Sequence, residues 1–440
     1  MSAPPLAAVS SWGRLSRAES RVIDLDGRGQ VARQIGGPGP AGLAYGNGRS
    51  YGDVCLNPDG RLWMTRRLDH AVEFDRANGR LRCEAGMLLS ELIALALPSG
   101  WFPPVTPGTQ LVTVGGAIAN DVHGKNHHRT GTFGCTVRAL TLARTDGTVL
   151  TCSATENPEL FAATIGGLGL TGVIVDADLQ LRRVAGPWMD VETVAFSGLD
   201  EFFAISKASE ADWEYGVAWI DCTGRGSSLG RGIFLRANHA SEARPGPPER
   251  QRRMFFTPPV SLINGLSLRV FNLAYYHAHR RMQGVSRRSY ASYFYPLDGL
   301  LEWNRIYGPR GFYQYQSVVP PAAARAATAD MLAAIGGSGT GSFLAVLKVF
   351  GQVASPGMLS FPMPGTTLAL DFPNGGASTQ GLFERLDFIV QAAGGRIYPA
   401  KDARMPADLF RRGYARLAEF LPHRDPGIDS AMARRLLGSA

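Results

Sequence analysis

Two stretches in the first part of the chain alternate apolar and polar residues with a period of two. They are AVEFDRANGRLRCEAG, residues 71–86, and VRALTLARTDGTVLTC, residues 137–152. Asn78-Gly79 and Asp146-Gly147 lie in the middle of these stretches, and such dipeptides favour the tight turns of β-hairpins. Each stretch therefore predicts a hairpin.

Three other stretches have helical spacing. LLSELIALALPSG, residues 88–100, predicts a helix that stops at Pro98 to Gly100. NPELFAAT, residues 157–164, predicts a helix with Asn157 as N-cap and Pro158 in its first turn. Near the C-terminus the apolar residues recur with four-three-four spacing, which predicts one continuous helix with a single apolar face: Phe410, Tyr414, Leu417 and Leu421.

The order of these elements predicts the fold class. Hairpins mixed with helices are typical of an α+β protein rather than of a parallel βαβ array. After about Arg183, the apolar stretches FYQYQSVVP, SFLAVLKVFG and TTLALDFP predict a second, sheet-rich domain. A chain of 440 residues also exceeds what one hydrophobic core usually serves, so two domains are expected.

The net charge of +8 is unevenly distributed. Residues 244–288 combine the apolar stretch MFFTPPVSLINGLSLRVFNLAYY with nine arginines and a single acid, Glu249: Arg244, Arg250, Arg252, Arg253, Arg269, Arg280, Arg281, Arg287 and Arg288. Two interpretations stay open, a solvated insertion and a surface that docks onto an anionic membrane. On a membrane each arginine adds ~1 kcal/mol, while apolar side chains dip between headgroups. No recognised nucleic-acid-binding motif accompanies the charge, so we expect no nucleic-acid partner.

Cysteine usage and the N-terminus bear on location. The five cysteines are an odd number without a Cys-x-x-Cys pair, which argues against a disulfide framework and for a reducing compartment. The N-terminal stretch lacks the basic start and apolar run of a secretory signal, and no window of about 18 apolar residues is present. We expect a cytoplasmic protein, with peripheral contact at the inner face of the plasma membrane.

Two glycine motifs suggest a nucleotide. GLGLTG, residues 167–172, has the form G-x-G-x-x-G, but a helix precedes it and a strand follows, which reverses the order of a dinucleotide-binding unit. YGNGRSYGD, residues 45–53, and PGTQLVTVGGAIANDVHG, residues 107–124, are long stretches of small residues. They predict either tight turns or two walls of a site for an extended ligand that carries a pyrophosphate.

The histidines of HGKNHH invite a metal hypothesis. His123 and His127 are four residues apart, but Gly124 between them makes a regular helix improbable, and no His-Glu-x-x-His arrangement or cysteine pair completes a site. We therefore expect no metal. A serine hydrolase is not supported either, because no G-x-S-x-G elbow is present.

Together these motifs resemble the FAD-linked oxidases of the vanillyl-alcohol oxidase family. The resemblance rests on six segments, spread over nearly the whole chain: GRSYGD, PGTQLVTVGGAIANDVHGKNHH, GGLGLTG, EWNRIYGPRGFYQYQ, RIYPAKDAR and SAMARRL. It implies an α+β fold in which residues 1–185 and 396–440 hold FAD and residues 186–395, with the basic insertion 244–288, form an antiparallel substrate domain. Many members bond the flavin through a histidine in the glycine loop. Tyr51 stands at that place here, so the resemblance implies non-covalent FAD.

The resemblance also assigns residues to the cofactor. By motif position the FAD-binding residues are Tyr45, Gly46, Asn47, Gly48, Arg49, Ser50, Tyr51, Gly52, Gly108, Thr113, Val114, Gly115, Gly116, Asn120, Asp121, Val122, His123, Tyr398 and Lys401. Lys401 is the candidate for stabilising charge on the reduced ring. A unit charge at about 4 Å is worth roughly 4 kcal/mol at an intermediate dielectric. A structural salt bridge is the alternative.

A further group matches substrate positions: Gly124, Lys125, Trp219, Tyr295, Gln314, Gln316 and Lys348. Lys348 lies in an apolar strand and needs a partner if it is buried. Gln314 and Gln316 are two apart, so they project from one face of a strand, either toward sugar hydroxyls or toward solvent. The catalytic candidates are Lys401, His123 and Lys348, with the base left open between His123, Lys401 and solvent.

The resemblance implies oxidation of the 2-hydroxyl of a polyprenylphosphoryl ribose to a keto sugar, which a partner short-chain reductase would carry on to the epimer. Thr367 and Ala369 replace an amide and a thiol of such enzymes, which puts the shape of the sugar pocket in doubt. Two alternatives stay open. One is an FAD oxidase of soluble sugars, alditols or aldonolactones that uses dioxygen. The other is a non-catalytic flavoprotein or a metal-binding scaffold.

Overall fold

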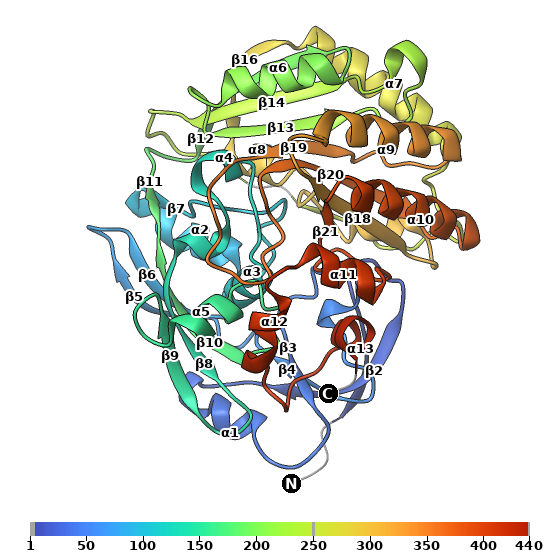
Figure 1. Ribbon diagram of the computed structural model, residues 1–440. Coiled ribbons are helices and arrows are strands. Elements are labelled where there is room, and N and C mark those ends of the chain that lie inside the picture. Colours follow the sequence, from blue (N-terminus) through green and yellow to red (C-terminus); the bar gives the residue numbers. More distant parts are fainter. Residues whose placement is uncertain (1–4, 249–250, 439–440) are drawn as a thin grey trace.

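The computed structural model describes residues 5–248 and 251–438, so Glu249 and Arg250 of the basic segment lie outside the described residues. The architecture is mixed α+β, as predicted. Smaller sheets from the first part of the chain lie at one end of the molecule and a large antiparallel sheet lies at the other (Figure 1). The predicted domain boundaries, 1–185, 186–395 and 396–440, stay predictions.

The first part of the chain forms two principal sheets. A four-stranded sheet has the order β1 (Leu6–Ser10), β2 (Arg17–Asp24), β4 (Arg61–Met64) and β3 (Gly42–Tyr45). A five-stranded antiparallel sheet has the order β5 (Ala71–Asp75), β6 (Arg80–Glu84), β10 (Val173–Gln180), β8 (Val137–Ala143) and β9 (Val149–Ser153). The pairs β5–β6 and β8–β9 are antiparallel hairpins, which confirms both hairpin predictions.

Short helices accompany these sheets. They are α1 (Val31–Ile35), α2 (Leu89–Ala96), α3 (Val114–Ala119), α4 (His127–Thr130) and α5 (Pro158–Thr164), with a small sheet of β7 (Trp101–Phe102) and β11 (Arg182–Arg183) beside them. One of them, α4, contacts strand β19 (Val346–Phe350) of the large sheet. Helix α2 ends before Pro98, and α5 begins at Pro158 as predicted. Asn157 is the N-cap residue of α5, as predicted, but its side-chain amide donates to the Thr151 carbonyl at 2.7 Å and makes no capping hydrogen bond.

The large sheet has eight antiparallel strands. Their order is β16 (Gly284–Ser289), β12 (Trp188–Phe196), β14 (Gly232–His239), β13 (Tyr215–Ile220), β19 (Val346–Phe350), β20 (Gly365–Pro373), β18 (Phe312–Val319) and β21 (Arg396–Ile397). Adjacent residues on a strand face opposite sides. On β14, Phe234 packs with Phe202, whereas Ile233 packs with Tyr276 on the other face.

Helices lie on both faces of this sheet. Helices α6 (Leu199–Ser209), α9 (Ala324–Ser338) and α10 (Ala377–Ala392) share one hydrophobic core with it. Helix α7 (Gly265–Arg281) lies on the other face, and α8 (Tyr290–Phe294) follows β16. The short strands β15 (Arg252–Arg253) and β17 (Leu300–Leu301) pair beside them. Among the described residues, no helix has both the length and the apolar character required to cross a bilayer.

The C-terminal tail returns to the N-terminal part as α11 (Ala407–Gly413), α12 (Leu417–Phe420) and α13 (Ala431–Leu437) (Figure 1). The prediction of one continuous helix through Leu421 is therefore wrong. The helix ends at Gly413, whose carbonyl accepts from Arg396 at 3.3 Å. Tyr414 leaves the helical conformation, and its hydroxyl donates to the Ile397 carbonyl at 2.8 Å. Contacts with β21 thus outweigh the helical spacing, and Leu421 is 43% exposed.

Candidate functional site

One large cavity, of about 570 Å³, lies between the N-terminal sheets and the face of the large sheet that bears α7. Both parts of the chain line it. Twenty-one of the predicted site residues lie in its wall: Gly46, Asn47, Gly48, Arg49, Ser50, Tyr51, Gly108, Thr113, Gly115, Gly116, Asn120, Val122, His123, Gly124, Lys125, Trp219, Gln314, Gln316, Lys348, Tyr398 and Lys401. Their individual roles stay predictions.

The structure places five predicted site residues behind the cavity wall: Tyr45, Gly52, Val114, Asp121 and Tyr295. The Tyr45 hydroxyl donates to the carbonyl of Ser10 at 3.3 Å. Gly52 contacts the loop that carries Lys401, because a Cβ there would lie 1.6 Å from the Asp402 carbonyl oxygen. Val114 is fully buried in the hydrophobic core under the second glycine stretch.

Asp121 and Tyr295 support the wall from one layer further out. The fully buried Asp121 carboxylate accepts hydrogen bonds from Ser355, at 2.5 Å, and from Ser360, so it ties the glycine stretch to a distant loop. The Tyr295 hydroxyl lies 2.5 Å from Thr106 Oγ1, and Thr106 lines the cavity. Both residues position neighbours that reach the cavity.

The two glycine stretches meet at the N-terminus of α3. Thr113 Oγ1 accepts from the Gly116 amide at 3.1 Å and so caps the helix. A Cβ on Gly46 would lie 2.5 Å from the same oxygen. The first glycine stretch can approach Thr113 this closely because residue 46 has no side chain. A Cβ on Gly108 would meet no atom within 4 Å, and Gly108 lines the cavity.

Four buried polar atoms of residues in the cavity wall have no hydrogen-bond partner among the described residues, and two of them, on Arg49 and Asn120, belong to the glycine stretches or their helix. Arg49 lies over the Trp12 ring, 4.1 Å from its centroid, and its Nε makes no hydrogen bond. Asn120 Oδ1 is likewise unpaired, although its Nδ2 donates to the Gly116 carbonyl at 2.9 Å. Buried polar groups are normally satisfied. A cationic donor and an amide acceptor beside a glycine cradle fit a ligand that carries both a phosphate and a polar ring.

Lys401 and Asp371 form a charged pair behind this cradle. Burial lowers the pKa of Lys401 to about 8, and the neighbouring Asp371 opposes that decrease. Burial raises the pKa of the Asp371 carboxyl to about 7, opposed by its hydrogen bond from Gln314 Nε2, 2.6 Å away, and by Lys401. Lys401 Nζ lies 4.2 Å from the centre of the Tyr51 ring. Each group favours the charged form of the other. The Lys401 ammonium is therefore retained at neutral pH although the side chain is buried.

Lys348 and His123 form a second cluster in the same wall. Lys348 Nζ lies 3.2 Å from His123 Nδ1 and 3.2 Å from the Gly124 carbonyl oxygen. The side-chain amide of Gln316 lies 2.8 Å from His123 Nε2 and 3.1 Å from Thr367 Oγ1. Both imidazole nitrogens of His123 are therefore engaged.

The pKa values of His123 and Lys348 give the two side chains different protonation states at neutral pH. Burial, then the charge of Lys348, holds the pKa of His123 well below its usual range. Burial, then the charge of Lys401, lowers the pKa of Lys348 to about 7. At neutral pH His123 is uncharged, whereas Lys348 exists in both protonation states. Lys348 is the better suited of the two to accept a proton.

The remaining substrate candidates lie further along the cavity. Lys125 Nζ donates to the Tyr293 carbonyl and lies 4.2 Å from the centre of the Tyr293 ring, and burial lowers the pKa of Lys125 to about 7. Trp219 Nε1 donates to the Phe343 carbonyl at 3.0 Å, and its ring lies 4.6 Å from that of Tyr275 on α7. The cavity thus continues from the charged clusters toward an aromatic and apolar end.

The histidines of HGKNHH do not converge on one point. His123 faces the cavity, His127 packs 4.6 Å from the Phe350 ring, and His128 Nε2 lies 3.2 Å from the Trp213 carbonyl oxygen. Burial lowers the pKa of His127 to about 4. Within the described part of the chain these histidines contribute to no group that could hold a metal.

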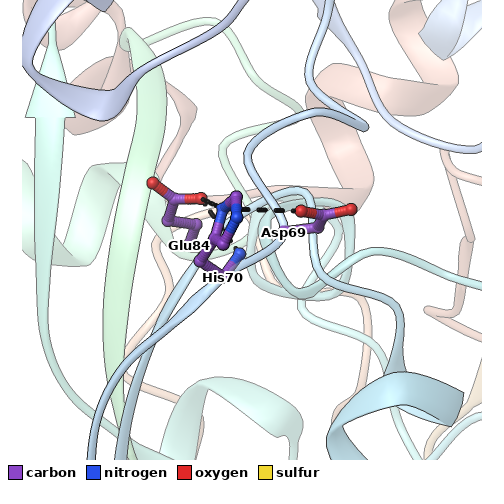
Figure 2. Close-up of side chains that lie close together, drawn as sticks. All are labelled: Asp69, His70 and Glu84. Atoms are coloured by element: carbon purple, nitrogen blue, oxygen red, sulfur yellow. Dashed lines mark hydrogen bonds and ion pairs between the residues drawn. The ribbon is translucent and has the colours of Figure 1, made fainter.

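A group of metal-ligating residue types does occur elsewhere. Figure 2 shows Asp69, His70 and Glu84, where a single ring nitrogen, His70 Nδ1, lies 3.5 Å from Asp69 Oδ1 and 3.1 Å from Glu84 Oε2. The His70 side chain is exposed, and all three residues lie outside the cavity wall. The arrangement is that of an ordinary hydrogen-bonded histidine.

Sequence reasoning missed several residues of this site. Asp371 had a signal, because it is the single acid of the apolar stretch TTLALDFP and lies two residues from a position assigned to the sugar pocket. Trp12, which lies under Arg49, and Thr106, which joins Tyr295 to the wall, had none. Their contacts join residues more than 30 positions apart, and such contacts leave no local pattern.

Comparisons with known proteins agree with this geometry. A family model described as an FAD binding domain matches residues 39–153. A decaprenylphosphoryl-beta-D-ribose oxidase of Mycolicibacterium smegmatis is 36% identical over 456 residues, which covers 99% of this chain and 95% of that protein. An uncharacterised protein of Streptomyces coelicolor is 35% identical over 370 residues, 79% of this chain and 99% of its own. The L-gulonolactone oxidase of Mus musculus is 34% identical over 137 residues, 31% of this chain and 30% of its own.

The FAD-domain match includes both glycine stretches, and the full-length similarity extends through the large sheet to the returning tail. The cradle, the unpaired Arg49 and Asn120 atoms and the buried lysines fit such a cofactor. The chain belongs to the FAD-linked oxidases of the vanillyl-alcohol oxidase family and is an FAD-dependent oxidoreductase.

Proposed function

We propose that this enzyme oxidises the 2-hydroxyl of a polyprenylphosphoryl-β-D-ribose to the 2-keto sugar. The observation that carries the proposal is the course of the cavity. It runs from the glycine cradle past Lys348 and Gln316 to Tyr275 of α7 and Leu300 of β17. Leu300 is 41% exposed, so the cavity reaches the surface at an apolar edge. A polar pocket that opens at an apolar edge suits a sugar joined to a lipid.

Different residues of the chain take different parts in the oxidation of the carbinol. When bound, FAD supplies the two-electron acceptor that takes the hydride from the C–H of the carbinol. Arg49 and the glycine stretches would bind the diphosphate, and Asn120, Tyr398 and Lys401 would face the ring. The Lys401 ammonium, kept charged by Asp371, stabilises negative charge that develops in the site. Gln314 and Gln316, on one face of β18, orient the sugar hydroxyls.

The hydroxyl proton also needs an acceptor. We assign it to the Lys348 amine, because burial brings the pKa of Lys348 to about 7 and its uncharged form is available at neutral pH. His123 Nδ1 and the Gly124 carbonyl oxygen each lie 3.2 Å from Lys348 Nζ and hold the amine in place. The carbinol then loses a hydride and a proton and becomes a carbonyl, which balances the reaction.

The same geometry supports FAD held without a covalent bond. Tyr51 occupies the position of the family's flavin-linked histidine, and burial raises the pKa of its hydroxyl well above the usual value. Cys55 is the cysteine of the cavity wall, and burial raises the pKa of its thiol to about 12. Neither side chain provides an anionic nucleophile at neutral pH. Denaturation should therefore release all the flavin into the supernatant.

A keto sugar on a lipid carrier calls for a second enzyme. Reduction of the 2-carbonyl from the opposite face gives the arabino epimer, so we propose a reductase of the short-chain type as the partner that consumes the product. The oxidase of soluble sugars, alditols or aldonolactones is the second candidate. It draws on the similarity to L-gulonolactone oxidase, which covers only 31% of this chain.

Isotopic substitution tests the position that is oxidised. Farnesylphosphoryl-β-D-ribose deuterated at C2 should reduce the enzyme-bound flavin more slowly than the unlabelled substrate, whereas deuterium at C3 should have no effect. Borohydride treatment of the product should then give both ribose and arabinose. An isotope effect at C3 alone, or a product that yields only ribose, would reject oxidation at the 2-hydroxyl.

A further inference from the structure

Helix α7 presents apolar side chains to solvent. Its buried residues, Leu268, Asn272 and Tyr276, follow one another at intervals of four and face the large sheet. Leu266, Val270 and Leu273 lie on the opposite side at intervals of four and three, and Leu266 is 75% exposed. A helix of a globular protein normally turns such a stripe toward the core.

The chain that leads into α7 has the same character. Phe255 is 85% exposed, and Phe256, Val260 and Leu262 are exposed as well. This segment is joined to the helix, because Ile263 and Phe343 pack against the same aromatic cluster and the Phe271 ring of α7 lies 6.0 Å from that of Phe343. We call the exposed side chains of Phe255, Phe256, Val260, Leu262, Leu266, Val270 and Leu273 the α7 patch. Apolar surface of this kind, when contiguous, marks an interaction site.

The charge around the α7 patch has a single sign. Residues 251–288 contain seven arginines and no acidic residue. Arg287 and Arg253 pair with acids from other segments. Arg269, Arg280 and Arg281 are exposed and form no ion pair within the described ranges 5–248 and 251–438. Unpaired cations beside exposed apolar groups are complementary to a surface that is both anionic and apolar beneath.

We propose that the α7 patch and these arginines dock the enzyme onto an anionic lipid bilayer. A second copy of the chain is disfavoured, because two such surfaces would bring the same positive charges together. Nucleic acid matches the charge but leaves Phe255 and Leu266 without an apolar partner. On a bilayer the arginines contact the headgroups, and the patch enters the boundary with the acyl chains.

Position strengthens the inference. Tyr275 and His279 of α7, Arg288 of β16 and Leu300 of β17 all line the cavity, so the docking surface borders the apolar end of the site. A lipid-linked substrate could then pass from the bilayer into the cavity without exposing its chain to water. The α7 patch and its unpaired arginines would bind an anionic bilayer whatever the substrate is. Vesicle binding without oxidation of lipid-linked ribose would contradict the proposed function and leave this inference standing.

Vesicle co-sedimentation of the purified holoenzyme, without substrate, tests the proposal. Binding should be strong to phosphatidylcholine vesicles that contain phosphatidylglycerol, weak to pure phosphatidylcholine, and reduced by added salt. The double variant Arg280→Ala/Arg281→Ala should bind about fivefold more weakly for each arginine removed. Its matched control is Arg411→Ala/Arg412→Ala on α11, two exposed arginines far from α7 in sequence, which should bind as the wild type does.

The apolar contribution has its own pair of variants. Phe255→Ser/Phe256→Ser should weaken binding to anionic vesicles, whereas Phe388→Ser on α10, which removes a phenyl group that is 72% exposed, should not. Retention of flavin shows that each variant is folded. Four outcomes would overturn the proposal: equal binding to both kinds of vesicle, equal losses in test and control variants, a dimer that the Phe255→Ser/Phe256→Ser change dissociates, or tighter binding to duplex DNA than to vesicles.

Discussion

At the scale of single residues, the site depends on buried ionisable side chains, whose charged forms burial disfavours. Lys401 and Asp371 would each tend toward the neutral form alone, because desolvation lowers the pKa of the amine and raises that of the acid. Each group favours the charged form of the other, which opposes the effect of burial. Asp371 does not line the cavity, so it acts on the reaction through its neighbours in the wall, Lys401 and Gln314.

The first prediction follows from this pair. Asp371→Asn removes the negative charge that raises the pKa of Lys401, so that pKa should fall below 8 by roughly one unit. The ammonium is then lost at lower pH, and the alkaline decline in the rate of flavin reduction should move to lower pH. Stopped-flow reduction across a pH series measures the shift. Asp330→Asn on α9, an exposed acid, is the control, and an unmoved profile in Asp371→Asn would contradict the role of the pair.

The second prediction concerns Lys401 itself. Lys401→Met keeps the length of the side chain and removes its charge, so the rate constant of flavin reduction should fall by about 10²–10³-fold. The decline at alkaline pH should also disappear, because the group that titrates is gone. Rapid-mixing kinetics on variant protein that retains its FAD gives both values. A variant that reduces at the wild-type rate would remove Lys401 from the mechanism.

At the scale of elements, the glycine loop and the returning tail fit together closely. A Cβ at position 52 would lie 1.6 Å from the backbone carbonyl oxygen of Asp402, next to Lys401. The third prediction is that Gly52→Ala displaces this loop, lowers the melting temperature and weakens FAD retention. Gly381→Ala within α10, where a Cβ meets no atom, should instead stabilise the protein by up to about 1 kcal/mol. Thermal unfolding and flavin fluorescence compare the two, and equal melting temperatures would contradict the close fit.

Local patterns predicted elements well and long-range contacts poorly. The hairpins at Asn78-Gly79 and Asp146-Gly147 and the helix start at Pro158 are set by turn and cap chemistry that is visible in a few residues. The broken C-terminal helix is set by Tyr414 and its contact with Ile397, which the apolar spacing does not contain. The same holds for the site. Its sequence motifs predicted the cavity wall, whereas the contacts of Asp371 with Gln314 and of Trp12 with Arg49 join residues that are distant in the sequence.

At the scale of the whole molecule, function is expected to lower stability. Lys348 has a pKa of about 7 in the folded protein and 10.5 as its ordinary value, so between these limits the unfolded chain binds the extra proton. The free energy of unfolding of the wild type therefore rises with pH, relative to a variant without this lysine, by up to about 1.4 kcal/mol per pH unit.

The fourth prediction tests that cost. Lys348→Met should have its largest stability advantage over the wild type at or below pH 7, and the advantage should shrink as pH rises toward 10.5. Urea unfolding at several pH values measures the difference. Lys207→Met, which replaces a lysine whose side chain is 80% exposed, should show no such trend. A difference for Lys348→Met that stays constant with pH would mean that Lys348 titrates normally in the folded state.

Flavin reduction in the absence of dioxygen tests the central claim most directly. Holoenzyme mixed anaerobically with farnesylphosphoryl-β-D-ribose should lose its visible flavin absorption, and free alditols or aldonolactones at the same concentration should leave that absorption unchanged. Bleaching by the soluble compounds alone would contradict the assignment of a lipid-linked sugar and favour an oxidase of free polyols.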